Sequence, residues 1–360
     1  MLLIPTTSEG RCGLFGRGSI SLYTPWLGRG FGFKSAWAKP RFGTAPTALL
    51  QGFAAIPQLE VHVICCSQRP MQSPKKLAEN IWFHSLRVPK IGWMRTAYQG
   101  CIRSMRSLLR TLQPDLVHGQ GTERDCAICA VLSGFRSVIT IHGNMNALAQ
   151  LHQARIGSFL WLAARLENFT LRRTRGIICI SEYVKNHVGK YGIPTWIIPN
   201  AIQKMFFDFP KERTSAPERP LLINVGVVSE RKRQRQLLTV LESLRDKGLD
   251  FDAFFMGRSS KSSPYATKFG EMLAAAQKKH GGFEHIQGLD DLSFCRLLDR
   301  ASAMIHFSRE ESFGLTFAEA IARGLYLFAS DVGAIRDIAA SVQRARIFGS
   351  DDWIGIRRGS

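Results

Sequence analysis

Residues 308–324 read SREESFGLTFAEAIARG and directly follow the apolar run Ala303–Phe307. The apolar run predicts a buried strand, and the residues from Leu315 onward predict a helix, with Gly314 in the turn between them. The first N–H groups of a helix have no partner within it, so those around Gly314, Leu315 and Thr316 would be free to bind an anion. The segment therefore predicts one strand–loop–helix step of an α/β domain with an anion site at the start of the helix.

Two carboxylates flank this turn. Glu311 precedes Gly314, and Glu319 lies eight positions after Glu311, inside the expected helix. A carboxylate accepts two hydrogen bonds at once and therefore suits the vicinal hydroxyls of a ribose or a hexose. A phosphate site between two such carboxylates is what a nucleotide-sugar needs. The alternative is a helix with Glu near its start for dipole reasons and Glu319 on a solvated face.

Strands and helices alternate along the chain on both sides of this segment. After residue 220 the pattern predicts strands at 221–225, 251–256, 285–287, 303–307 and 326–329, and helices at 234–247, 265–279, 291–300 and 315–323. Before residue 208 it predicts strands at 59–65, 116–118, 137–141, 176–180 and 196–198, and helices at 46–56, 96–112, 127–132, 158–173 and from 181 onward. Short strands that are apolar on both faces are typical of parallel sheets covered on both sides.

Two such units predict an α/β fold of two Rossmann-like doubly wound domains, incomplete at both termini. The 360 residues, 45% of them hydrophobic, suffice for two cores. Residues 1–45 have no clear periodicity and stay unassigned, 46–207 form the first domain, the polar segment 208–220 is a linker, and 221–360 form a shortened second domain. Ligands of such sheets bind beyond the carboxyl ends of the strands, so the expected site is the crevice between the domains.

The composition limits which kinds of binding partner and which cellular compartment are expected. A net charge of +20 and a pI of about 10.1 favour anionic partners such as phosphorylated substrates, anionic lipid or nucleic acid. We expect no nucleic acid, because the positive charge is spread out and no helix-turn-helix, zinc or RNP motif occurs. No metal is expected, since the pair Cys126 and Cys129 lacks a second ligand pair. Free buried thiols, with no signal peptide or spanning segment, indicate a cytoplasmic protein.

Residues 311–324 resemble the EX7E motif of retaining GT-B glycosyltransferases, particularly the large group 1, or family 4, class. That motif places a strand before E-x-F-G-L and a second Glu in the following helix, which ends in a small-residue–Gly step. Weaker resemblances lie at 114–118, 141–143, 180–182, 199–202, 225–234 and 330–335. The resemblance spans roughly residues 45–340. It implies a metal-independent transfer of a hexose-type sugar, without cofactor, from a UDP- or GDP-sugar to a glycan or lipid-linked acceptor in cell-surface polysaccharide synthesis.

The resemblance also implies roles for individual residues. Glu319 would hold the ribose hydroxyls, Glu311 would orient the donor sugar, and Lys232 would neutralise the diphosphate leaving group. His142, from the facing domain, would contact the sugar near the reacting carbon. The remaining donor-binding positions would be Phe313, Gly314, Leu315, Thr316, Gly226 and Arg231. The alternatives are a solvated basic turn for Lys232 and a hydrogen-bonded strand end for His142, and for His118 we favour a structural role.

Three features depart from the family pattern. Val227 stands where the family usually carries an Arg, and the nearest substitutes are Arg231 and Arg233. The first strand and its Gly-rich loop cannot be recognised among residues 1–45, although Gly28, Gly30 and Gly32 occur there. About twenty residues follow Asp337, which is few for the usual C-terminal strand and helices. A catalytically impaired remnant that binds nucleotide or a partner protein is therefore the alternative function, and a nucleotide-sugar epimerase is another.

A basic helix face suggests a membrane contact. Residues 85–113 carry no acid, and Arg103, Arg106 and Arg110 lie on the polar side of the helix expected at 96–112. Such a helix can lie on an anionic membrane, which predicts a protein held at the inner face of the cell membrane. The alternative is an ordinary solvated helix face.

Overall fold

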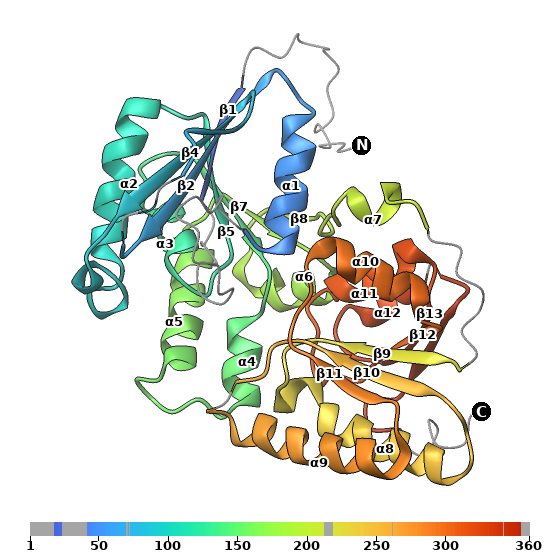
Figure 1. Ribbon diagram of the computed structural model, residues 1–360. Coiled ribbons are helices and arrows are strands. Elements are labelled where there is room, and N and C mark those ends of the chain that lie inside the picture. Colours follow the sequence, from blue (N-terminus) through green and yellow to red (C-terminus); the bar gives the residue numbers. More distant parts are fainter. Residues whose placement is uncertain are drawn as a thin grey trace.

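The computed structural model describes residues 18–23, 42–69, 71, 73–211, 219–260, 262–340 and 342–353. These residues form two α/β domains, each built on a largely parallel sheet with helices on both faces (Figure 1). The first domain takes the blue-to-green part of the chain, and the second takes the yellow-to-red part. The structure confirms the predicted pair of Rossmann-like doubly wound domains.

The sheet of the first domain has the strand order β3-β4-β2-β1-β5-β6-β7-β8, and all neighbours are parallel except β3 and β4. Its strands are β1 (Gly18–Tyr23), β2 (Leu59–Ser67), β3 (Lys76–Ala78), β4 (Ile81–Arg87), β5 (Leu116–Gln120), β6 (Ser137–Ile141), β7 (Gly176–Cys179) and β8 (Thr195–Ile197). Its helices are α1 (Thr44–Ala54), η1 (Lys90–Gly92), η2 (Met94–Thr96), α2 (Gln99–Leu112), α3 (Asp125–Val131), α4 (Met145–Leu151), α5 (Phe159–Leu171), α6 (Glu182–Val188) and η3 (Gly189–Tyr191).

Strand β2 shows why helices pack on both faces of this sheet. Its residues Val61 and Val63 pack with Leu50 of α1, whereas Ile64 packs with Met105 of α2 on the opposite face. Successive side chains of a strand point to opposite faces, so a run that is apolar throughout needs helices on both sides. Helix α1 covers one face, and α2 and α3 cover the other.

Strand β1 corrects the expectation for residues 1–45. It lies in the middle of the sheet, where Ile20 pairs with Val61 of β2 on one side and with Leu116 of β5 on the other. The sequence GSISLY hides this strand, because serines alternate with apolar residues where a central strand was expected to be apolar throughout. Ser21 is fully buried all the same. The glycines noted at 28, 30 and 32 lie outside the described residues.

The second sheet has the order β11-β10-β9-β12-β13-β14, with every pair parallel among the described residues. Its strands are β9 (Leu221–Val225), β10 (Asp252–Met256), β11 (Phe283–Ile286), β12 (Ala303–His306), β13 (Tyr326–Ser330) and β14 (Ala345–Phe348). Its helices are η4 (Glu230–Lys232), α8 (Gln234–Asp246), α9 (Pro264–His280), α10 (Asp291–Arg300), α11 (Leu315–Arg323) and α12 (Ile335–Ala339). Figure 1 shows α8 and α9 on one face, and α10, α11 and α12 on the other.

The second domain differs from the sequence expectation near both of its ends. Strand β14 adds a further strand beyond β13, in the region where a shortened domain was expected. Helix α7 (Met205–Asp208) falls mostly within the expected first domain, yet Phe206 is buried in the core of the second domain. The guanidinium of Arg323 fixes it there by donating to the carbonyls of Phe206 and Phe209 at 3.2 and 2.8 Å. Part of the expected linker, residues 212–218, lies outside the described residues.

The two domains touch at residues 312–315, just before and at the start of α11. Phe313 and Leu315 join an apolar cluster that contains Ile180 and Val184 of the first domain. The hydroxyl of Ser181 donates to the carbonyl of Ser312 at 2.8 Å. Ser181 also caps α6, by accepting from the backbone N–H of Val184. The loop before α11 is therefore held against the carboxyl end of β7.

Candidate active site

The order of the second sheet places two loops side by side. Strands β9 and β12 are neighbours, and the strand order reverses between them. In an open α/β sheet such a reversal leaves a crevice beyond the carboxyl ends of the strands, where ligands bind. The loop after β9 carries Lys232 and the loop after β12 carries Glu311, so the fold brings together two residues that are 79 positions apart.

Lys232 and Glu311 form the centre of the candidate site. The ammonium of Lys232 donates to Oε2 of Glu311 at 2.5 Å, and Arg231 lies 3.9 Å from the same oxygen. The side chains of Lys232 and Glu311 are only 12% and 15% exposed. Lys232 is therefore not the solvated basic turn of the alternative interpretation.

His306 completes this cluster and was not anticipated from the sequence. Its Nε2 lies 3.2 Å from Oε2 of Glu311 and 3.4 Å from Nζ of Lys232. The ring is fully buried at the last position of β12, and its Nδ1 has no partner among the described residues. Burial and the neighbouring Lys232 lower the pKa of His306, so the ring is neutral, and a proton on Nε2 lets it donate to Glu311.

The charges around Glu311 keep it ionised in spite of its burial. Burial by itself would raise the pKa of Glu311, but Lys232, His306 and Arg231 outweigh it and hold the pKa well below its ordinary value. Burial lowers the pKa of Lys232, and Glu311 opposes that effect. The site therefore holds a carboxylate and an ammonium in direct contact, with little water around either.

A glycine and a glutamine shape the loop that carries Lys232. A Cβ at Gly226 would lie 3.3 Å from Cε of Lys232, so the glycine leaves room for the lysine stem. The side-chain amide of Gln234 donates to the carbonyl of Val227 at 3.1 Å and accepts from the N–H of Ser229 at 3.2 Å. Gln234, which the sequence did not single out, folds the loop back on itself and positions Lys232.

The start of α11 presents the free amides that the sequence predicts. Gly314 precedes the helix with a φ of 91°, which favours glycine. The N–H groups of Gly314, Leu315 and Thr316 find no acceptor in the described part of the chain. Three unpaired N–H groups at a helix start, together with the helix dipole, favour an anion. The Phe313 side chain, in contrast, packs into the domain junction, which leaves only its backbone for the donor.

Glu319 lies inside the protein rather than on a solvated face. It is 3% exposed on the side of α11 that faces α10, and its carboxylate makes no hydrogen bond or ion pair within the described residues. Burial, with a smaller contribution from Asp291, raises the pKa of Glu319 to about 8. A buried carboxylate without a partner is costly, and such groups concentrate at functional sites.

The structure distinguishes between Arg231 and Arg233, the two possible substitutes for the arginine that the family usually carries at position 227. Arg233 turns away from Lys232 and binds the carbonyl of Ser350 and the carboxylate of Asp351, both at 2.6 Å. Arg231 lies beside Glu311 and is the better substitute. Val227 itself is 58% exposed.

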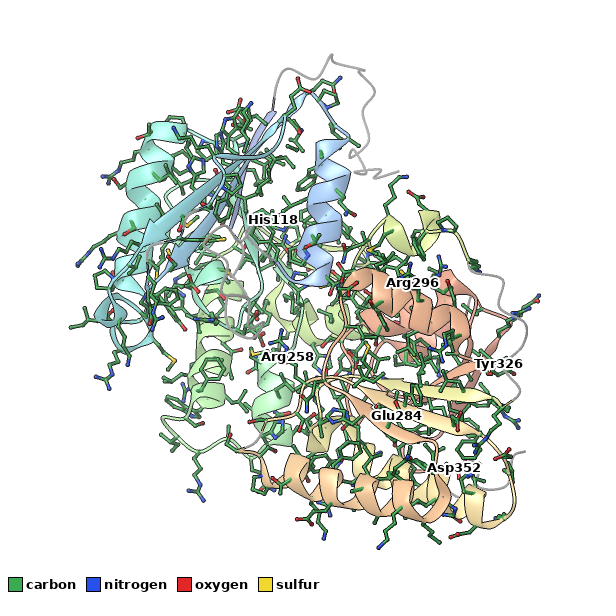
Figure 2. All side chains as sticks on the ribbon, viewed as in Figure 1. His118, Arg258, Glu284, Arg296, Tyr326 and Asp352 are labelled. Carbon is green, nitrogen blue, oxygen red and sulfur yellow. The ribbon has the colours of Figure 1, made fainter. Side chains whose placement is uncertain are left out.

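Arg258 lies beside this loop from another strand. It follows β10, and its carbonyl accepts from the N–H of Val228 at 2.9 Å. Figure 2 shows Arg258 in the region between the two domains in this view. Sequence reasoning had no means of finding it, because only the pairing of β9 with β10 brings residue 258 next to residue 228.

Gly333 supports the backbone of Glu311. Its φ is 57°, and a Cβ there would lie 1.8 Å from the carbonyl oxygen of Glu311. We expect Gly333→Ala to destabilise the protein by about 2–4 kcal/mol, because it adds a backbone clash to the left-handed penalty of about 1–2 kcal/mol. Urea unfolding followed by circular dichroism measures the loss. It should be accompanied by reduced nucleotide binding, because Glu311 and the helix start must move.

Gly134→Ala is the matched control for Gly333→Ala. Gly134 also has a positive φ, 93°, but a Cβ there would meet nothing within 4 Å. The control therefore carries the left-handed penalty alone and should leave nucleotide binding intact. Equal losses of stability and of binding in both variants would contradict the support that Gly333 gives to Glu311.

His142 lies at the edge of the first sheet that faces this site. It follows β6, next to β7, whose carboxyl end is tied to Ser312. Its Nε2 lies 2.7 Å from Oε1 of Gln120, and burial lowers the pKa of His142 to about 4. The ring is neutral at physiological pH and can act as a hydrogen-bond partner of a bound sugar, but not as a charge.

His118 has the structural role that we favoured. It is buried within the first domain (Figure 2), with Nε2 2.7 Å from the hydroxyl of Thr140. The side-chain amide of Gln120 lies 3.0 Å from the same nitrogen. Burial, followed by His142, lowers the pKa of His118 to about 3. The hydrogen-bonded series His118–Gln120–His142 therefore orients the partly buried ring of His142 from within the first domain.

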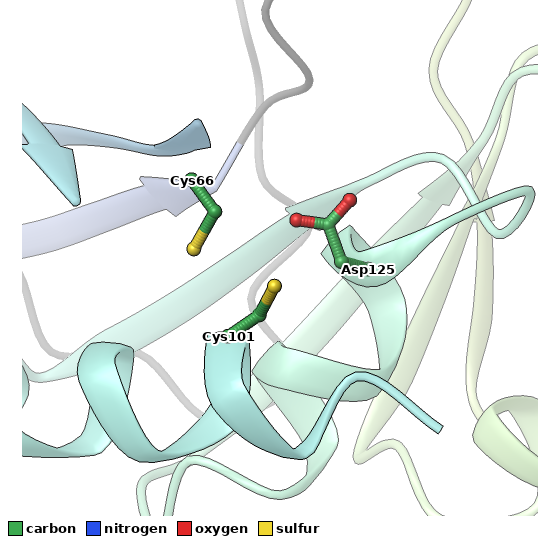
Figure 3. Close-up of side chains that lie close together, drawn as sticks. All are labelled: Cys66, Cys101 and Asp125. Atoms are coloured by element: carbon green, nitrogen blue, oxygen red, sulfur yellow. The ribbon is translucent and has the colours of Figure 1, made fainter. Parts of the chain in front are cut away.

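One group of side chains in the first domain has positions that could hold a metal ion. The thiols of Cys66 and Cys101 and the carboxylate of Asp125 lie within 4.8 Å of one another, all buried (Figure 3). A hydrogen bond with Cys66, together with burial, raises the pKa of the Cys101 thiol strongly. Metals bind the thiolate form of cysteine, and the raised pKa keeps the Cys101 thiol neutral. The arrangement therefore favours thiols that pack in the core over thiolates that bind a metal. Cys126 and Cys129, the CxxC pair, are buried in the same core.

The basic helix face is where the sequence places it. Arg103, Arg106 and Arg110 are exposed on α2, opposite the buried Met105 and Leu109. In the described part of the chain, no helix combines the length and the apolar character that a membrane span requires.

Comparisons with known proteins agree with this architecture. Residues 47–204 match the model of glycosyltransferase family 4, and residues 206–358 match the model of glycosyl transferases group 1. A serotype-specific mannosyltransferase, WbdA, of Escherichia coli is 24% identical over 200 residues, which are 50% of this chain and 24% of the relative. The chain thus covers about a quarter of the length of this curated relative.

Two solved structures share the fold. Sucrose-phosphate synthase from Thermosynechococcus elongatus superposes with a TM-score of 0.71 at 15% identity, over 95% of this chain and 88% of that one. WaaG, a glycosyltransferase involved in lipopolysaccharide biosynthesis, gives a TM-score of 0.67 at 15% identity, over 94% and 88%. Two matched domains on a shared two-domain framework, with the site at their junction, lead to one conclusion: this chain belongs to the group 1 / family 4 glycosyltransferases with the GT-B fold.

Proposed function

We propose that this glycosyltransferase moves a hexose-type sugar from a UDP- or GDP-sugar to a glycan or lipid-linked acceptor, with retention of configuration at the reacting carbon and without a metal. The observation that carries the proposal is Glu319, a carboxylate 3% exposed that has no partner in the described part of the chain. The two hydroxyls of a ribose would supply the hydrogen bonds that it lacks. The free amides at the start of α11 support a diphosphate next to that ribose.

The cluster at Glu311 fits the reacting end of such a donor. As the sugar leaves, negative charge builds up on the departing diphosphate, and the ammonium of Lys232 would stabilise it in a site with little water. Arg231, and the amides of Gly314 and Leu315, would share that charge. Glu311, kept ionised by Lys232 and held by His306, would accept hydrogen bonds from the donor sugar. His142 would contact the sugar from the first domain.

The proposed place of action is the cytoplasmic face of a membrane. Arg103, Arg106 and Arg110 form an exposed basic row on α2, which is the kind of surface that anionic lipids attract. Co-sedimentation with vesicles of phosphatidylglycerol in phosphatidylcholine tests this contact. We expect binding that weakens when the three arginines are replaced by glutamine, and equal binding to neutral vesicles would contradict it.

Turnover tests the proposed reaction. We expect slow hydrolysis of UDP- or GDP-hexoses even without an acceptor, and transfer when a membrane extract supplies one. Glu311→Gln and Glu319→Gln should each lower that turnover. Turnover that both variants retain in full would show that the site lies elsewhere, and nucleotide binding without any turnover would favour the catalytically impaired alternative.

A further inference from the structure

A cavity of about 380 Å³ opens at the carboxyl edge of the first sheet. Its walls include Gln68 after β2, the η1–η2 segment after β4, Arg124 after β5, and Phe159 at the start of α5. A second cavity of the same volume lies at the opposite, amino-terminal edge of the second sheet, lined by Ser302 and Leu325. Ligands of parallel sheets bind at carboxyl edges, so only the first cavity is placed to serve the reaction.

The described lining of this cavity is basic and contains no acid. Lys90, Arg95 and Arg124 contribute three positive charges, and none of them forms an ion pair with a carboxylate in the described part of the chain. Two acids flank Arg124 in the sequence and do not line the cavity: Glu123, which interacts electrostatically with Arg124, and Asp125, which is 3% exposed and acts with burial to raise the pKa of Tyr98 to about 12. Three cations around one cavity, none of them in a salt bridge, favour an anion such as a phosphate.

The other walls are aromatic and apolar. Trp93 and Tyr98 meet edge to face with ring centroids 6.3 Å apart, and the guanidinium of Arg124 lies 5.5 Å from the Trp93 ring. Met94 and Phe159, which also line the cavity, are 41% and 47% exposed. Large apolar side chains that are exposed beside a cavity indicate that an apolar part of a ligand packs against them. The cavity therefore suits a ligand with an anionic group and an apolar part.

The aromatic wall is held in place by its backbone. The indole N–H of Trp93 donates to the carbonyl of Val88 at 3.0 Å, and the N–H of Tyr98 donates to the carbonyl of Trp93 at 2.9 Å. Ala97 and Tyr98 both have positive φ, 48° and 63°, which costs energy for residues other than glycine. Strained residues persist where the surrounding structure fixes them, and they cluster at ligand sites.

We propose that this cavity binds the phosphate of an amphiphilic acceptor, with the apolar chain of that acceptor lying along Met94 and Phe159. The inference rests on the proposed function, because it names the chemical class of the acceptor. In the sheet order, three strand spacings separate β2 from β6, which His142 follows. At 4.7–4.9 Å for each spacing, the end of β2 lies about 14 Å from the end of β6. The phosphate would therefore bind near β2, and the group that accepts the sugar would lie nearer to His142.

Binding of a simple alkyl phosphate to the full chain tests the inference. Calorimetry with dodecyl phosphate below its micelle concentration should show saturable binding that exceeds that of dodecyl maltoside and of inorganic phosphate. The exposed pair Arg95→Gln and Arg124→Gln should weaken it by about tenfold for each cation removed. The matched control, Arg172→Gln with Lys278→Gln, removes two exposed positive charges that do not line the cavity and should leave this binding unchanged.

Each contrary result has its own meaning. Equal weakening by the control pair, or equal binding of dodecyl maltoside, would overturn the phosphate site. Equal binding of inorganic phosphate would overturn the apolar part. If the Arg95 and Arg124 variants lose binding to phosphatidylglycerol vesicles while monomeric dodecyl phosphate does not bind at all, the surface contacts a membrane and the inference fails. Stabilisation by UDP or GDP should be unaffected in the same variants. This measurement separates a failure of the acceptor site from a failure of the proposed function, because nucleotide binding tests only the latter.

Discussion

Lys232→Met is expected to lower the rate of sugar transfer by about a hundredfold to a thousandfold, which is the usual loss when one preorganised charge-stabilising group is removed. Lys232 is the cation in direct contact with Glu311, 2.5 Å away, and it is only 12% exposed. In such surroundings a charge is stabilised by the protein rather than by water, so another group cannot readily replace it. The kcat at saturating donor and acceptor, measured well below the unfolding temperature, gives the loss.

A neighbouring cation provides the control for Lys232→Met. Arg233→Met removes a positive charge from the next position, but the guanidinium of Arg233 binds Ser350 and Asp351 and not Glu311. We expect this variant to lose stability while it retains most of its kcat. A kcat loss as large as that of Lys232→Met would mean that the charge of the whole loop matters rather than the contact of Lys232. In that case the assignment of Lys232 to the leaving group would be wrong.

Glu319→Gln is expected to stabilise the ligand-free protein while it weakens nucleotide binding. Burial raises the pKa of Glu319 from an ordinary value of 4.5 to about 8. Between pH 4.5 and pH 8 the folded chain therefore keeps a proton on Glu319 that the unfolded chain has lost. The wild-type protein therefore loses stability as pH rises through this window, by a few kcal/mol in total. Glutamine does not titrate, so the advantage of the variant should grow from about pH 5 to pH 8 and then level off.

Urea unfolding of both proteins at pH 5, 7 and 9 measures this difference. An advantage that does not change with pH would contradict a buried, unpartnered carboxyl at position 319. Nucleotide affinity should change in the opposite sense, with a loss of about tenfold to a hundredfold in the variant, because two hydrogen bonds from the ribose to a charged acceptor are replaced. Wild-type affinity should also rise with pH up to about 8, since the ionised carboxylate is the form that accepts both hydroxyls.

The sequence was most informative where function restricts the choice of residues. The spacing of Glu311, Gly314 and Glu319 identified a helix start with a carboxylate on either side, and α11 begins and ends where predicted. The pairing of Lys232 with Glu311 is consistent with the roles drawn from the family resemblance. It could not have come from the sequence alone, because it depends on β9 and β12 being neighbours.

The missed parts have physical reasons. His306 looked like an ordinary residue in an apolar run, and only its buried contact with Glu311 makes it a member of the candidate site. Strand β1 was hidden by alternating serines, although it pairs with β2 on one side and with β5 on the other. The short strand β14 has only four residues and is specified by its pairing with β13 more than by its own pattern. The direction of Arg233 follows from its positive φ of 55°, which a sequence does not disclose.

The most direct test of the site compares nucleoside diphosphates with monophosphates. Calorimetry of UDP, UMP, GDP and GMP should show that one base is preferred and that its diphosphate binds more tightly than its monophosphate. A diphosphate present at 100 times its Kd should raise the free energy of unfolding by about 2.7 kcal/mol. In Lys232→Met the advantage of the second phosphate should shrink. Equal binding of mono- and diphosphate, or no binding of any of the four, would contradict a diphosphate held between Lys232 and the first turn of α11.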